Sequence, residues 1–501
     1  MTVPQWRDEL AGTKAAYAQD LEARGFVHVS GNTWIGPVTV PSATGDEVTK
    51  YKLVLPDDFP FSWPTVYLAR PPDVYDWHLQ PPGQLCLWRR EDTRDRPWET
   101  VEGLFNRIRR WHERAREGWL GDEGDLDLDR YFPSDSSYPL VTYGDLSQLI
   151  GQRLSREHKE NGWIHLVPSR MPRKQRRQAT KWAFGADLGV LERPVWDWKT
   201  TFAAMGSVER GEVENLTRLN GPGLLLLRYE RIGTSGSQEA AAVLSVTPQP
   251  NTVPELRSAA AVAQDTPEFR ILRAGPDAPR LALSSAAIIG CGAVGSFLAE
   301  MLAMSGIGSL VLVDPDRLMP GNCIRHLAGP DLVPRFKVEA IESVLASRQL
   351  RIPIETHHDR LDPDLAFRLL TMCDIVIDAA ADGGATSLLE HLANVTGKIF
   401  IKAALHRDGG ILRIDRLGPG TASERPGPIP DLGDGAALRE AGCGDPISPT
   451  PPSAVIAAAS AACRMTVDTL QASRRRRLPD CMVEVLLPQP DHPYDRVGIL
   501  S

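Results

Sequence analysis

The stretch Ala286-Ala287-Ile288-Ile289-Gly290-Cys291-Gly292-Ala293-Val294-Gly295 decides the fold of the C-terminal part of this 501-residue chain. Its apolar run opens directly onto G-x-G-x-x-G, a helical pattern follows, and a second apolar run ends in Asp314, about twenty residues on. Gly290 permits the tight turn, Gly292 lets backbone N–H groups approach a phosphate, and Gly295 lets the helix pack close to the strand. The pattern predicts a βαβ nucleotide-binding unit, with the positive helix end facing an anion and Asp314 accepting hydrogen bonds from a ribose hydroxyl.

The residues that follow distinguish ATP from a dinucleotide. They are Asp316, Asn322, Arg325 and Lys337. A hydride-transferring enzyme has no need of clustered Arg, Lys and Asn beside the ribose acid, whereas an adenylating enzyme needs positive groups to hold a triphosphate as pyrophosphate leaves. A further strand-like run, Ile375-Val376-Ile377-Asp378, leads to Asp382, so a Mg²⁺ ligand for that triphosphate is also present.

From about residue 284 to 470 the chain resembles the adenylation domain of the ThiF/MoeB and ubiquitin-activating enzyme family. The resemblance implies that Asp314 contacts the ribose of ATP and that Asn322, Arg325 and Lys337 are phosphate and catalytic contacts. It also implies that the domain pairs as a homodimer through the face beside the ATP site. The family usually has an acid three residues after the strand-end Asp, where this chain has Ala381. Asp378 and Asp382 therefore both remain candidates for the Mg²⁺ ligand, and we favour Asp382.

The N-terminal third has the order of one helix, a meander of about four strands, a cysteine loop and a second helix. With His78-Leu79-Gln80 eight residues before Cys86, in Gly-Gln-Leu-Cys-Leu-Trp, this part resembles the ubiquitin-conjugating enzyme fold. The resemblance implies that Cys86 carries a thioester and that Gln80 takes the place of an Asn that stabilises an oxyanion, a donor worth about 3 kcal/mol in comparable sites. We interpret His78 as structural, packed against Trp77.

A second reactive thiol is expected at Cys443. The segment Leu438–Pro446 places it between two glycines, ahead of the apolar helix pattern Ser453–Met465. In the ubiquitin-activating family a mobile loop carries the thioester cysteine just before such a helix, and only the thiolate attacks. The other cysteines (Cys291, Cys323, Cys373, Cys463 and Cys481) are interpreted as structural.

We expect an α/β multidomain protein. Its parts are an α+β ubiquitin-conjugating-like domain at 1–135, an α/β linker domain at 136–280 and a Rossmann-like ThiF-type adenylation domain at 281–501. Acidic, turn-rich sequence at about 121–137 marks the first boundary. In the middle part no catalytic constellation is evident, and the basic cluster Arg170–Lys181 is interpreted mainly as a solvated face.

Composition narrows the function. A formal net charge of −8 disfavours nucleic-acid binding, and neither a signal peptide nor a long apolar run is evident, so a cytoplasmic protein is expected. The seven cysteines include no C-x-x-C pair, which argues against a disulfide framework and against structural zinc.

Both halves together resemble fused conjugating and activating enzymes of bacterial operons, including antiphage ones. The resemblance implies that ATP, with Mg²⁺, activates the C-terminal carboxylate of a ubiquitin-like protein, which passes to Cys443, to Cys86 and finally to an amine of an acceptor protein. Three alternatives remain open: a sulfur-carrier adenylyltransferase, an NAD-dependent oxidoreductase, and a non-enzymatic scaffold with an inactive N-terminal domain.

Overall fold

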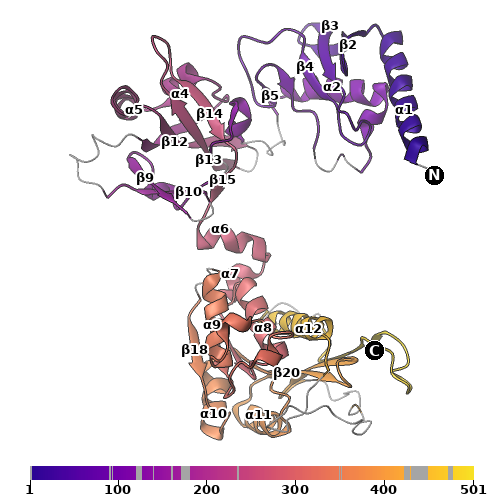
Figure 1. Cartoon of the computed structure of the whole chain (residues 1–501), viewed down its shortest axis with the longest axis vertical. Helices are drawn as coiled ribbons and strands as arrows, with labels where there is room; N and C mark the ends of the chain where they lie inside the picture. Colours follow the sequence, from indigo (N-terminus) through magenta and orange to yellow (C-terminus); the bar gives the residue numbers. More distant parts are fainter. Residues whose placement is uncertain are drawn as a thin grey trace. The chain divides into compact units, whose positions relative to one another are not determined.

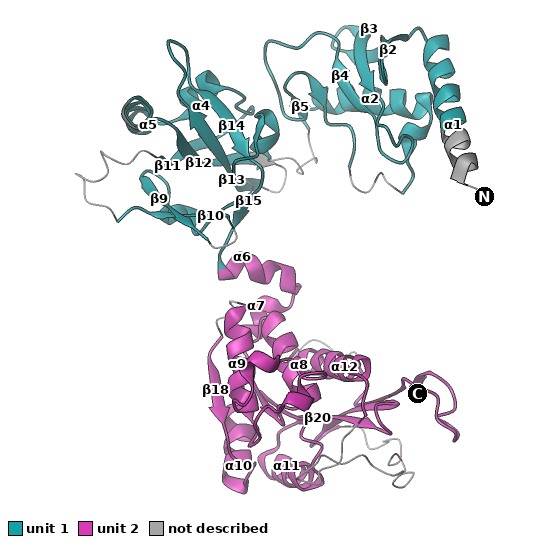
Figure 2. Cartoon of the chain, in the orientation of Figure 1, with its two compact units in different colours: residues 1–266 teal, residues 267–501 magenta. Residues whose placement is uncertain are grey.

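The computed structural model divides the chain into two compact units, residues 1–266 and 267–501 (Figures 1 and 2). It describes residues 3–89, 92, 94–119, 127–138, 140–159, 162–170, 181–233, 236–348, 350, 352–421, 429, 449–471 and 478–500. Each unit is described by itself. The chain is a mixed α/β protein, and its predicted division at residues 135 and 280 stays a prediction.

Unit 1 begins with a helix, a six-stranded sheet and a second helix. The helices are α1 (Val3–Ala23) and α2 (Val101–Arg116), and the strands are β1 (Val27–Ser30), β2 (Thr33–Ser42), β3 (Gly45–Val54), β4 (Thr65–Leu68), β5 (Leu79–Gln80) and β6 (Gln84–Leu85). The sheet order is β1-β2-β3-β4-β6-β5, and every pairing is antiparallel. Alternate residues of β2, including Trp34, Val38 and Val40, are buried with Leu104 and Ile108 of α2, which confirms the predicted helix, meander, loop and helix.

The rest of unit 1 is a nine-stranded mixed sheet in the order β15-β8-β10-β9-β11-β12-β13-β14-β7. Its strands are β7 (Ser134–Asp135), β8 (Val141–Tyr143), β9 (Arg153–His158), β10 (Ile164–Pro168), β11 (Trp182–Val190), β12 (Gly223–Gly233), β13 (Gly236–Thr247), β14 (Glu255–Ala259) and β15 (Val262–Gln264), with helices α4 (Trp198–Ala204) and α5 (Ser207–Asn220). The apolar run on β12 is buried on both faces, because Leu225 and Leu227 belong to one core cluster and Leu224 and Leu226 to another.

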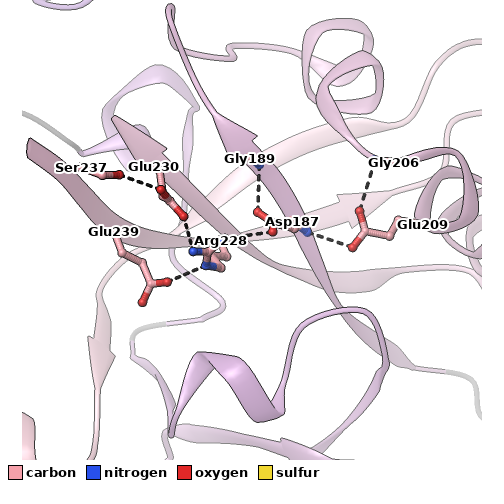
Figure 3. Close-up of polar contacts among 8 residues, drawn as sticks. All are labelled: Asp187, Gly189, Gly206, Glu209, Arg228, Glu230, Ser237 and Glu239. Carbon is pink, nitrogen blue, oxygen red and sulfur yellow. Dashed lines mark hydrogen bonds and ion pairs between the residues drawn. The ribbon is translucent and has the colours of Figure 1, made fainter. Parts of the chain in front are cut away.

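A charged ladder crosses β11, β12 and β13 near the sheet surface (Figure 3). Arg228 on β12 donates to Asp187 on β11 at 2.9 Å and to Glu239 on β13 at 2.5 Å, and it also contacts Glu230 on its own strand. Since Asp187 and Arg228 are direct partners in the parallel register, these pairs reinforce the alignment of the central strands.

Unit 2 is a doubly wound sheet in the order β18-β17-β16-β19-β20-β21-β22-β23. Its strands are β16 (Ser285–Ile289), β17 (Ser309–Val313), β18 (Ile354–His357), β19 (Ile375–Asp378), β20 (Phe400–His406), β21 (Ile411–Leu417), β22 (Cys481–Val485) and β23 (Gly498–Leu500). The first five are parallel and the last three extend the sheet antiparallel. The chain turns from β16 toward β17 on one side and later places β19 on the other, so a topological switch point lies between β16 and β19.

Helices cover both faces of this sheet (Figure 1). The helices of unit 2 are α6 (Pro267–Ile271), α7 (Ala278–Leu281), α8 (Ala293–Met304), α9 (Lys337–Ser347), α10 (Pro363–Met372), α11 (Gly383–Thr396) and α12 (Pro452–Leu470), of which α8 to α12 pack against the sheet. Ile288 of β16 is buried with α8, α9 and α12, whereas its neighbour Ile289 is buried with α10 and α11. Among the described residues, no helix combines the length and the hydropathy that crossing a bilayer would require.

Candidate functional site

The glycine turn after β16 lies at the switch point. Gly290 has a φ of 84°, and a Cβ there would lie 2.4 Å from the Cα of Ala380, after β19. At Gly295 in α8, a Cβ would lie 1.9 Å from the carbonyl oxygen of Gly290. Both positions therefore need glycine for close backbone approach. Gly292 caps the N-terminus of α8, and a Cβ there would meet nothing within 4 Å, which leaves open space beside the first N–H groups of the helix.

Asp314 connects the end of β17 to that turn. Its Oδ2 accepts from the N–H of Cys291 at 2.7 Å, and its Oδ1 accepts from the N–H of Asp316 at 2.8 Å. Burial raises the pKa of Asp314, and the nearby Lys337 ammonium opposes that shift. Asp314 thus holds the glycine turn in place. Each of its carboxylate oxygens has a second lone pair, which could accept a hydrogen bond from a ribose hydroxyl as predicted.

Lys337 is the first residue of α9 and points back at the same acids. Its Nζ lies 2.7 Å from Oδ2 of Asp316 and 3.8 Å from Oδ1 of Asp314. Its backbone N–H also donates to the carbonyl of Asp316 at 3.0 Å. Lys337, the predicted phosphate contact, therefore forms ion pairs with carboxylates of its own chain. To bind a phosphate, its ammonium would have to leave Asp316.

Arg325 lies on a short segment that is tied to α8. Asn322, at the end of a 3-10 turn (Pro320–Asn322), accepts from Met319 through its side chain and from the N–H of Arg325 at 3.0 Å through its backbone. Leu327 donates to Oγ of Ser296 in α8 at 3.2 Å, which brings the segment to the glycine turn. Within the described part of the chain, the guanidinium of Arg325 has no carboxylate partner. It is a cation available to an anionic ligand.

The pKa of the neighbouring His326 is affected by the charges around it. His326 is buried, and its pKa is lowered to about 4, first by burial and then by the positive charges of Lys337 and Arg325. Its ring is therefore neutral at physiological pH. Lys337 and Arg325 are therefore both close enough to disfavour a charge on this ring.

The two acids beyond β19 are in different surroundings. Asp378 is buried, its Oδ1 accepts from the N–H of Ala380 at 3.0 Å, and its Oδ2 accepts from Thr386 at 2.6 Å. Asp382 is exposed and caps α11. Its Oδ1 accepts from Gly384 at 2.8 Å and Ala385 at 3.4 Å, and its Oδ2 accepts from no group among the described residues. Asp382 therefore acts as the N-cap of α11 through Oδ1, which leaves its Oδ2 for a metal. Neither acid belongs to a cluster of three or more metal-ligating side chains among the described residues.

Three polar groups at this edge were missed from the sequence. Lys402 stands opposite Asp378 in the parallel register of β19 and β20, Thr386 donates to Asp378, and Ser296 holds the Arg325 segment. A lysine inside the apolar run Phe400–Leu405 was the one available signal.

Cys86 lies just after a small hairpin in unit 1. Gln80 pairs with Gln84 and Leu79 with Leu85, and the N–H of Cys86 donates to the carbonyl of His78 at 2.9 Å. Cys86 therefore continues the ladder two residues beyond Gln84. Strand alternation places Gln80 and Cys86 toward the same face, as diagonal neighbours that are about 7–8 Å apart in such ladders. Gln80 is buried and Cys86 is half-buried.

Aromatic residues hold this hairpin in unit 1. The ring of His78 packs against Trp119 at a centroid distance of 4.2 Å, and the carbonyl of His78 accepts from Nε1 of Trp111 at 3.2 Å. The partner expected for His78 was Trp77, but Trp77 instead donates from Nε1 to the carbonyl of Glu192 at 3.0 Å. The structural interpretation of His78 fits these contacts, with Trp119 in place of Trp77.

The remaining cysteines differ in surroundings. Cys443 lies outside the described residues. Burial raises the pKa of the Cys291, Cys373, Cys463 and Cys481 thiols, to about 12 at Cys481. This agrees with the structural interpretation of these four, because a raised pKa suppresses the reactive thiolate.

Comparison with known proteins gives the family of part of the chain. Residues 232–424 match the model of the ThiF family, so the chain contains a ThiF family domain. The adenylyltransferase and sulfurtransferase MOCS3 of Bos taurus is 29% identical over 142 residues, which cover 28% of this chain and 31% of that protein. The ATP-dependent ubiquitin transferase-like protein Cap2 of Pseudomonas aeruginosa (strain BWHPSA011 / Pa011) is 28% identical over 257 residues, which cover 44% of this chain and 43% of that protein.

Among solved structures, E. coli MccB with MccA-N7isoASN is similar with a TM-score of 0.37 and 18% identity, over 45% of this chain and 66% of that one. The chain spans less than half the length of the two curated relatives named above.

Proposed function

We propose that this protein uses ATP to activate the C-terminal carboxylate of a ubiquitin-like protein and transfers it through thioesters to an amine. The observation that carries the proposal is the cluster at the switch point of unit 2. There an open helix N-terminus, Arg325, Lys337 and the acids Asp314 and Asp382 belong to one sheet edge, and the guanidinium of Arg325 has no carboxylate partner among the residues that the structure describes. A hydride-transferring enzyme would have no use for these cations.

The residues present fit ATP and Mg²⁺. The space beside Gly292 admits a phosphate where a Cβ would meet no neighbour, and Asp382 keeps one carboxylate oxygen for a metal. ATP would supply the AMP group that activates the carboxylate. In this proposal the α8 N-terminus and Arg325 bind the phosphates, Asp314 orients the ribose, and Lys337 leaves Asp316 to stabilise charge on the departing pyrophosphate.

The proposed reaction has four steps. A carboxylate oxygen of the ubiquitin-like protein bonds to the α-phosphorus of ATP, and pyrophosphate leaves. The thiolate of Cys443 attacks the activated carbonyl, and AMP leaves. The thiolate of Cys86 then attacks the Cys443 thioester, and Cys443 leaves as its thiolate. An amine finally attacks the Cys86 thioester; Cys86 leaves as its thiolate, and the amine nitrogen loses a proton as the amide forms. Gln80 donates a hydrogen bond to the oxyanion of the last step. Conjugation, a homodimeric assembly, a cytoplasmic location and a role in bacterial antiphage defence are parts of this proposal.

Two cysteine variants test the order of transfer. With Cys443→Ala, pyrophosphate exchange should persist while no thioester forms at either cysteine. With Cys86→Ala, a thiol-sensitive adduct should stop at Cys443. Cys323→Ala, which removes a half-buried thiol outside the proposed relay, is the matched control and should behave as wild type. Normal loading of Cys86 in Cys443→Ala would refute the relay, because transfer would then run directly from AMP to Cys86.

A sulfur-carrier adenylyltransferase is the second candidate, favoured by the similarity to an adenylyltransferase and sulfurtransferase. It would use the same ATP site without Cys86. Activation that is followed by thiocarboxylate formation, and that is unchanged in Cys86→Ala, would support this candidate over the conjugating one.

A further inference from the structure

A cavity of about 200 Å³ opens in unit 1 where two strands of the nine-stranded sheet separate. β9 and β11 pair only through Arg153↔Phe184 and Leu154↔Ala183, and beyond Leu154 their ladder ends. The guanidinium of Arg156 fills the gap, and its Nη2 donates to the carbonyl of Trp182. The cavity is therefore a consequence of strand divergence. It has room for about six waters or one phosphate with part of its substituent.

The side chains around this cavity are predominantly positive. Arg153, Arg156, His158 and Lys181 line it, and no carboxylate is among its lining residues. Arg153 is paired with Glu212 of α5 at 3.0 Å. On the strand next to the opening, Glu157 is paired with Lys159 at 2.9 Å. These two acids are thus already paired with cations, and among the described lining residues Arg156 and Lys181 give the cavity an excess of positive charge.

Arg156 is the most informative of these residues. Within the described residues its hydrogen-bond acceptors are uncharged: the carbonyl of Trp182 and the phenol oxygen of Tyr138, the latter at 3.4 Å. It forms no ion pair with any residue in the described ranges, and its buried Nε lacks an acceptor there. Burial lowers its pKa, which means that its charge is poorly solvated. A desolvated guanidinium without an anion is unfavourable, and an anionic ligand would relieve that cost.

We propose that this cavity binds the phosphate group of a small phosphate monoester or of free phosphate, held by Arg156 and Lys181. A guanidinium matches two phosphate oxygens in a planar fork, and the ammonium adds a second point of charge. The site belongs to unit 1 and is separate from the switch point of unit 2. It assigns a ligand to a part of the chain that the proposed transfer reaction does not use.

Isothermal titration with the full chain tests this site. Lys337→Ala is included in every sample to weaken phosphate binding at the switch point. The probes are inorganic phosphate, AMP and adenosine, at constant ionic strength in chloride. We expect phosphate and AMP to bind and adenosine not to bind. If AMP binds much more tightly than inorganic phosphate, the natural ligand is a nucleotide. If the two bind with equal affinity, the site recognises the phosphate group alone.

The variants are Lys181→Ala, whose side chain is exposed and forms no ion pair with the described residues, and the conservative Arg156→Lys. Each should weaken phosphate binding by about tenfold, the effect of one charge-assisted contact. Lys159→Ala removes the same charge beside the cavity without lining it and should leave the affinity within about twofold of wild type. Absence of phosphate binding at millimolar concentration, or equal losses in Lys159→Ala and Lys181→Ala, would overturn the assignment.

Discussion

Replacing Gly295 and Gly292 by alanine should separate folding from nucleotide binding. At Gly295 the new Cβ would lie 1.9 Å from the carbonyl oxygen of Gly290, whereas ordinary contacts begin at 3.4 Å, so one backbone segment must move by about 1.5 Å. The turn is fixed by the register of β16, and α8 is fixed by buried Leu298 and Leu302. Moving either the turn or α8 would cost packing energy. We therefore expect Gly295→Ala to lower the free energy of unfolding by about 3 kcal/mol, the upper end of the usual cost of overpacking.

For a unit of this length, residues 267–501, that loss corresponds to a fall in Tm of about 6–12 °C. Gly292→Ala should change stability by no more than about 0.5 kcal/mol, because its Cβ would meet no atom within 4 Å. It should instead weaken ATP binding by at least about tenfold, or 1.4 kcal/mol, since the methyl group would occupy the approach to the α8 N-terminus.

Differential scanning calorimetry of the full chain measures the first effect, and titration with a fluorescent ATP analogue measures the second. Wild type is the reference for both. Equal melting temperatures for Gly292→Ala and Gly295→Ala would refute the packing argument. Unchanged ATP affinity in a folded Gly292→Ala would refute the placement of a phosphate at this helix end.

Three further predictions concern charge, pH and assembly. Arg325→Ala should lower pyrophosphate exchange by at least about tenfold, roughly 1.4 kcal/mol of transition-state binding, while the surface variant Arg335→Ala should not; unchanged exchange in Arg325→Ala would remove it from the site. Burial and the nearby Asp127 raise the pKa of Asp129 to about 7. Because the folded state then binds this proton more tightly than the unfolded chain, the stability it contributes is complete below about pH 4 and is lost as the pH rises through 7. Urea unfolding should show that Asp129→Asn flattens this dependence, and an identical pH profile in the variant would contradict the assignment. Light scattering should return a homodimer at micromolar concentration, and a 55.0 kDa monomer would contradict it.

Local sequence patterns predicted much of the architecture. The alternating strands and the amphipathic helix of the N-terminal part, and the strand, glycine turn and helix at Ala286–Met304, depend on spacing within a few residues. Such patterns are visible in one sequence because side-chain periodicity alone decides which face is buried. The roles of Gly290 and Gly295 could be stated for the same reason, since a turn and a close helix are local events.

Tertiary structure decided what depends on register between distant strands. The parallel pairing of β16, β19 and β20 places Ala380 against Gly290, and it places Lys402 opposite Asp378. Ala380 follows Gly290 by about ninety residues in the sequence, so no local pattern could show this contact. Spacing could not assign the distinct surroundings of Asp378 and Asp382, because burial follows from helices packed over the sheet. The surroundings of Arg156 were likewise hidden, because the sequence does not show that this arginine fills the gap between two diverging strands.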